Sequence, residues 1–116
     1  MKTLAAVVII LLFTSFIGCS DKCDGENPTV RLVNNGTGKA DIQIKTSGGN
    51  TENINNIEIG ASSAARSFDQ GDIEFTITIQ GVPDPIVYQL QVFHCADYVV
   101  TVNGDNSVSG TATERD

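Results

Sequence analysis

The strongest constraint on the fold is a strict alternation of apolar and polar side chains over residues 73–80 (IEFTITIQ). Successive side chains of a β-strand point to opposite faces, so this segment predicts a half-buried strand with its isoleucines and phenylalanine inside. No stretch after Cys19 shows the i, i+3, i+4, i+7 apolar spacing of an amphipathic helix over three turns. The chain is therefore predicted to be all-β.

Shorter or weaker versions of this alternation recur along the chain. They predict further strands at 30–33, 40–45, 57–59, 86–92, 98–102 and 108–113. Clusters rich in Asn, Gly, Ser and Asp separate them and suit hairpin turns, because these residues tolerate positive φ. The segment 60–68 (GASSAARSF) fits either a helical turn or an irregular or edge crossing. About seven short, fully antiparallel strands predict a β-sandwich in which each sheet has one buried and one wet face.

The pattern of strands resembles that of a small immunoglobulin-like β-sandwich over nearly the whole chain that follows Cys19. Asp97-Tyr98, just before residues 99–102, is similar to the tyrosine corner of such folds, in which a tyrosine hydroxyl ties down a loop. The resemblance implies an antiparallel immunoglobulin-like sandwich over residues 28–116. An antibody-type domain is not expected, because the chain has no Trp and Cys23 precedes the first strand.

The first 18 residues are predicted to be a secretory signal peptide rather than part of the domain. Met1-Lys2-Thr3 is a short basic start, residues 4–13 (LAAVVIILLF) are all apolar, and small Gly18 precedes Cys19. Ten apolar residues fall short of the about 20 that a membrane-spanning helix needs. An N-terminal anchor that stays uncleaved is the alternative.

Phe16-Ile17-Gly18-Cys19 resembles the lipobox of bacterial lipoproteins, with Phe16 at the position where Leu is usual. The resemblance implies that the Cys19 sulfur receives a diacylglycerol and that Cys19 becomes the new N-terminus. Two or three acyl chains, such as palmitate, would hold the protein on a membrane, and residues 19–27 would form a short tether. Ser20-Asp21-Lys22 is similar to signals that send lipoproteins to the cell surface in the Bacteroidota. We therefore expect the protein to be anchored in the outer membrane, in either its inner or its outer leaflet.

The acidic balance excludes one class of partner. Cleavage after residue 18 would leave 98 residues with 14 acidic and 6 basic side chains, a net charge of about −8. Such a domain has no basic patch with which to neutralise phosphates, so nucleic-acid binding is not expected. The same charge predicts that the body of the protein stands away from anionic lipid head groups.

The cysteines suggest a covalent crosslink. If Cys19 carries lipid, Cys23 and Cys95 remain as a pair in an oxidising compartment, and a disulfide between them is our hypothesis. Two free thiols are the alternative. The bridge would clamp the start of the domain to a late strand.

The residues offer little for catalysis or metal binding. His94 is the single histidine and is expected to be exposed or to cap a strand start, whereas blue-copper and common zinc sites need more. The acids Asp69, Asp72 and Glu74, and the pair Asp105-Asn106, do not have the spacing of a calcium loop. No serine sits in a nucleophile elbow, and no glycine-rich loop precedes a helix. We therefore expect no enzyme activity, no metal and no cofactor.

Aromatic side chains are the remaining candidates for a binding surface. Phe75, Tyr88 and Tyr98 fall on predicted core faces, and only Phe68 and Phe93 could be exposed, although burial is expected for both. The polar faces at 76–80 and 53–56 should be solvated, or could be edges for strand addition by a partner. The leading hypothesis is a lipid-anchored, non-enzymatic envelope protein that supports or binds another envelope protein. The alternative is a carbohydrate- or calcium-binding module.

Overall fold

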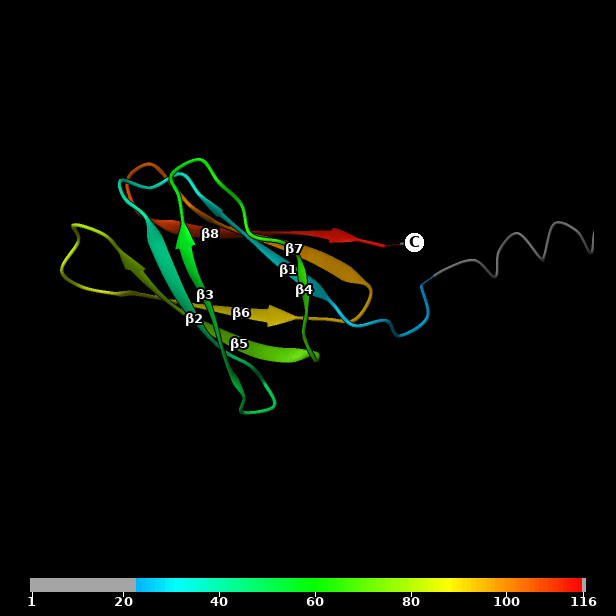
Figure 1. Cartoon of the computed structure of the whole chain (residues 1–116). Helices are drawn as coiled ribbons and strands as arrows, with labels where there is room; N and C mark the ends of the chain where they lie inside the picture. The colour runs from blue at the N-terminus through cyan, green and yellow to red at the C-terminus, as the bar shows by residue number, and fades with distance from the viewer. Residues whose placement is uncertain (1–22, 116) are drawn as a thin grey trace, which may run out of the picture.

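The computed structural model describes residues 23–115 as two stacked β-sheets (Figure 1). The predicted signal peptide, the lipobox and Cys19 lie outside these residues. Within them there is no helix, and so none that could span a membrane. The eight strands are β1 (Thr29–Asn34), β2 (Ala40–Lys45), β3 (Thr51–Ile57), β4 (Arg66–Ser67), β5 (Gly71–Ile79), β6 (Ile86–Val92), β7 (Ala96–Val102) and β8 (Val108–Glu114).

Each sheet has four strands, and the fold class predicted from the sequence is confirmed. One sheet has the order β4-β1-β7-β8 and the other β3-β2-β5-β6. The expectation of fully antiparallel strands is wrong for one pair, because β1 runs parallel to β7 from Thr29↔Asp97 to Asn34↔Val102. The physical reason is that β1 and β7 begin at the same end of the sandwich, where the disulfide joins Cys23 to Cys95. Both strands start beside this bridge, and they run side by side away from it.

The core fills the space between the sheets. Ile73, Phe75, Ile77 and Ile79 of β5 are all buried, as the alternation predicts. The Phe75 ring packs against Tyr88 of β6 with ring centroids 6.3 Å apart. The buried core cluster draws on both sheets and consists of Val30, Leu32, Ala40, Ile42, Ile44, Ile57, Phe68, Ile73, Phe75, Ile77, Ile79, Val92, Ala96, Tyr98, Val100 and Val102.

The connection from β3 to β4 differs most from the sequence prediction. The strand expected at 57–59 is instead β3, which ends at Ile57. Thr51, Asn53 and Asn55 of β3 are exposed, and the strand has too few apolar residues for an alternating pattern to predict it. β3 forms through its pairing with β2. The ambiguous segment 60–68 crosses to the other sheet and contains β4, a two-residue edge strand that makes the total eight.

Asn34, the last residue of β1, connects the end of β3 to the turn that follows β1. Its side chain is buried, and its Nδ2 donates to the carbonyl oxygens of Gly38 and Ile57, both at 2.9 Å. Its Oδ1 accepts the Gly36 N–H at 3.0 Å. All hydrogen-bonding atoms of this buried amide are thus engaged, which is the condition for burying a polar group at low cost.

Candidate functional site

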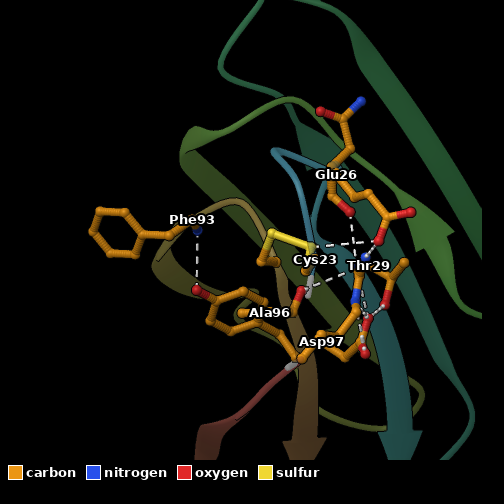
Figure 2. Close-up of polar contacts among 10 residues, drawn as sticks. Cys23, Glu26, Thr29, Phe93, Ala96 and Asp97 are labelled. Atoms are coloured by element: carbon orange, nitrogen blue, oxygen red, sulfur yellow. Dashed lines mark hydrogen bonds and ion pairs between the residues drawn. A yellow bond between two sulfur atoms is a disulfide. The ribbon is translucent and has the colours of Figure 1, made fainter. Parts of the chain in front are cut away.

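The end of the sandwich at which β1 and β7 begin carries several long-range polar contacts (Figure 2). The disulfide between Cys23 and Cys95 lies here, with the two Cα atoms 5.8 Å apart, so the predicted pairing is confirmed. The Cys95 N–H donates to the Glu26 carbonyl at 2.9 Å, and the Arg115 N–H donates to the Cys95 carbonyl at 2.8 Å. The first and last described residues are therefore fixed to the same turn.

Arg115 clamps this junction through its guanidinium group. Its Nε lies 3.1 Å from both Asp97 carboxylate oxygens, and its Nη2 lies 2.8 Å from Asp97 Oδ1 and 2.8 Å from the Asn27 carbonyl oxygen. The Thr29 hydroxyl also donates to Asp97 Oδ1. Charge-assisted and bidentate contacts of this kind are the stronger hydrogen bonds in proteins. The clamp connects β1, β7 and the end of β8.

The same contacts set the charge state of the clamp. The hydrogen bond from Arg115, with a second from Thr29, holds the pKa of Asp97 below its ordinary value of 3.8. The hydrogen bond to Asp97 raises the pKa of Arg115. The pair therefore stays ionised at neutral pH, and its role is structural, because each charge already faces its partner.

Tyr98 forms the contact that the tyrosine-corner resemblance implies. Its ring is buried, and its hydroxyl oxygen accepts the backbone N–H of Phe93 at 3.0 Å. This bond holds the turn between β6 and β7. The Phe93 side chain points away from the junction (Figure 2) and is 52% exposed, so its expected burial is wrong. It follows the last residue of β6 and leaves the sheet with the turn, whereas Phe68 is buried as expected.

A depression of about 590 Å³ lies beside this turn, between β6 and β8. Phe93, Ala96 and Ala112 contribute apolar surface, and Gln91 and Arg115 contribute polar groups. His94 also lines it and is exposed, as expected. It lies in the turn before β7 rather than on a strand, and its backbone N–H donates to the Gln70 side chain at 2.9 Å. The surface is open and of mixed polarity, which suits a protein partner better than a buried small molecule.

The acidic residues considered as calcium ligands either make structural hydrogen bonds or lie too far from one another to share a metal ion. Within residues 23–115 no three His, Cys, Asp or Glu side chains come together to hold a metal ion. The Asp105 carboxylate accepts the Ser107 N–H at 3.0 Å and its hydroxyl at 2.6 Å, and these bonds lower the Asp105 pKa. Asn106 bonds Thr37 through both side-chain atoms, which ties the β7–β8 turn to the β1–β2 turn.

The four sheet edges are unequal. On one flank β4 has only two residues, and β3 is irregular near Asn56, which has φ of +62° and pairs with a register shift in β2. Arg66 of β4 and Glu52 of β3 pair across this flank at 3.1 Å. On the other flank the edges are β6 and β8, which are seven residues each and regular in register. Short length and irregularity protect edges from pairing, and the β6 and β8 edges lack both features.

Comparison with known proteins adds fold information. The chain matches no protein-family model, and no curated protein sequence matches it. It is similar to a solved structure, the C-terminal domain of AlgF from P. aeruginosa, with a TM-score of 0.50 and 13% sequence identity. The match covers 78% of this chain and 99% of that one. This likeness supports the β-sandwich and carries no functional assignment.

Proposed function

We propose that this protein is a lipid-anchored, non-enzymatic module of the cell envelope that binds another envelope protein. The observation that carries the proposal is the position of the junction relative to the lipobox-like motif. Cys23, whose disulfide fixes the chain to β7, lies four residues after Cys19 in the sequence. A lipid on Cys19 would therefore be connected to a rigid domain by a very short tether.

The exposed surface supports a binding role. Phe93 is a large apolar side chain that the fold leaves half exposed beside an open depression, and the adjacent edge strand β8 is unpaired on its outer side among residues 23–115. Exposed aromatic side chains and free strand edges are features that proteins use for recognition. We place the module at the outer membrane, in either leaflet, on the basis of Ser20-Asp21-Lys22.

Lipidation is tested by labelling cells with an alkyne analogue of palmitate. We expect the wild-type chain to carry the label and to fractionate with membranes, and Cys19→Ser to lose both properties. Cys23→Ser is the matched control, because it removes a neighbouring thiol and the disulfide but leaves the acceptor sulfur. Label on Cys19→Ser, or membrane fractionation equal to that of the wild type, would refute the anchor.

Partner binding is tested by crosslinking the wild-type protein in intact cells and recovering it from detergent-solubilised envelopes. We expect one protein to be enriched, and its recovery to fall when Phe93 is changed to Ser. Absence of any crosslinked protein with the wild-type chain would refute the binding role.

One observation favours a second candidate. Aromatic rings stack on sugars, and Phe93 is an exposed ring at the edge of an open depression. A glycan-binding module would show a rise in melting temperature with at least one member of a glycan panel, and Phe93→Ala would abolish that rise. No shift with any glycan would remove this candidate.

A further inference from the structure

The β8 edge has the geometry of a vacant sheet position. β8 pairs with β7 through seven consecutive registers, from Ala96↔Glu114 to Val102↔Val108, with no bulge. Arg115 donates to Cys95 and Asn103 donates to Ser107 just beyond the two ends of this ladder. Hydrogen-bonded and non-hydrogen-bonded pairs alternate in an antiparallel ladder. The backbone groups of Val108, Gly110, Ala112 and Glu114 therefore point outward from β8, toward the free edge.

The side chains at these positions leave room for another strand. Gly110 and Ala112 are the smallest residues available, and a Cβ at Gly110 would lie 2.5 Å from the Tyr88 hydroxyl oxygen, so β8 packs closely over β6. The other face of β8 carries Ser109, Thr111 and Thr113, which are exposed and uncharged. Glu114 is the single charged residue of the strand. β8 contains no lysine or proline, the residues that commonly prevent an exposed edge strand from pairing with another chain.

The charge around this flank is of one sign. Residues 67–114, which contain β5 to β8 and the turns between them, include no Lys or Arg. They include seven acids: Asp69, Asp72, Glu74, Asp84, Asp97, Asp105 and Glu114. Of these, Asp97 is neutralised by Arg115. The basic side chains of residues 23–66 are Arg31, Lys39, Lys45 and Arg66. Lys39 and Arg66 pair with Glu58 and Glu52, and Lys45 of β2 stands opposite Glu74 of β5. The part of the sandwich that contains the free flank thus has an excess of acidic side chains.

We propose that the β8 edge binds an extended, basic segment of the partner protein as an added antiparallel or parallel strand. This inference rests on the proposed binding function and names its site and the chemistry of its partner. Main-chain hydrogen bonds to the outward groups of β8 supply the affinity in such strand addition, and side-chain pockets supply the specificity. Lysine or arginine side chains of the added strand would meet the acidic flank, and an apolar side chain would enter the depression lined by Phe93 and Ala112.

The charge argues against a second copy of this chain as the occupant. Pairing of β8 with β8 would bring together two acidic flanks that have no basic residue between positions 67 and 114. Like charges across an interface oppose association, whereas opposite charges speed and direct it. The other edge of this flank is β6. It follows Pro83 and Pro85, and it lies across the depression from Ala112 of β8.

The probe for the test is a blocked seven-residue peptide of alternating lysine and valine, with a glutamate–valine peptide as the control for charge. Both are titrated into the isotope-labelled domain, from residue 19 onward with its disulfide intact, at low and high salt. We expect the lysine peptide to bind and to slow exchange of the outward amides of β8. Salt should weaken this binding, because it screens exposed charges.

Two variants of β8 and two controls decide the site. Ala112→Pro removes an N–H group that points to the free edge and leaves every hydrogen bond between β7 and β8 in place. Ala112→Ser is its control, because serine keeps this N–H and is similar in size to alanine. Thr111→Lys adds a cation to the free edge, and Thr51→Lys makes the same change on β3 at the other flank. We expect at least tenfold weaker binding for Ala112→Pro, several-fold weaker binding for Thr111→Lys, and less than twofold change for the controls. Thermal unfolding verifies that each variant is folded.

The results separate this inference from the proposed function. Perturbed amides on β3 or β6 in place of β8, equal binding of the glutamate peptide, or dimerisation through β8 would each overturn the inference. In cells, recovery of the crosslinked partner that is unchanged by both Ala112→Pro and Thr111→Lys would overturn it while leaving the binding role intact. Loss of that partner with both variants, but not with Ala112→Ser or Thr51→Lys, would support it.

Discussion

Removing the Cys23–Cys95 disulfide should cost the domain a large part of its stability. The bridge closes a loop of 72 residues. The chain-entropy relation gives such a loop about 15 cal/mol/K of lost freedom in the unfolded state, or about 4.4 kcal/mol at 25 °C. Domains of this size are stabilised by only about 5–15 kcal/mol in total. We therefore expect Cys23→Ala/Cys95→Ala to remain folded at room temperature only marginally.

The assay is urea unfolding followed by circular dichroism, with wild type and double variant side by side. A domain of this size has an m value on the order of 1 kcal/mol/M, so the midpoint should fall by about 4 M. The m value itself should rise, because the unfolded chain without the bridge exposes more surface. Reduced wild-type protein should match the double variant, since both lack only the crosslink.

Two results would refute the reasoning. A loss below about 1 kcal/mol would show that the unfolded chain is already compact around this loop. A large loss with an unchanged m value would show that the sulfurs act through native packing and not through the unfolded chain. The backbone hydrogen bonds of Cys95 to Glu26 and Arg115 do not depend on the sulfur atoms, and they should persist in either case.

Three further predictions concern single side chains. Asn34→Ala leaves the Gly36 N–H and two carbonyl groups without their partners and should cost about 3–5 kcal/mol by urea unfolding, whereas exposed Asn35→Ala should cost little. Tyr98→Phe removes the acceptor of the Phe93 N–H; it should cost about 1–2 kcal/mol, and hydrogen exchange of that amide should accelerate. The pKa of Asp97 is lower in the folded state than its ordinary value of 3.8, so its contribution is present above pH 3.8 and is lost as the pH falls through the lower folded value. Asp97→Asn should therefore lose stability at pH 7 and show a smaller further loss on acidification, with Asp105 retaining part of the pH dependence.

Much of the fold was predictable because it follows from local alternation. Residues 73–79 bury every second side chain, and the sequence shows this without any tertiary information. β3 was not predictable in this way, because its strand forms by pairing with β2 while most of its side chains face solvent. The parallel β1–β7 pair depends on where two distant segments meet, and local patterns do not encode that.

The candidate site shows the same division. Cys23 and Cys95 were predictable as a pair because few cysteines were available, and Tyr98 because its position near the start of a strand suits a tyrosine corner. The exposure of Phe93 could not be predicted, because it depends on the direction in which the chain leaves β6. Arg115 was missed altogether. A lone arginine near the C-terminus carries no periodic signal, and its partners lie 18 to 89 positions away along the chain.

The bridge between Cys23 and Cys95 also determines how the domain would carry a mechanical load. A pull on the chain ahead of residue 23 passes through the sulfur atoms directly into β7, so β1 is spared from being peeled away. From β7 the tension reaches β8 along the strand axes, across a ladder whose hydrogen bonds lie perpendicular to it. Those bonds share the force at once rather than breaking one after another. A domain held at one end and gripped along β8 would thus resist extension by shear, its stiffest direction.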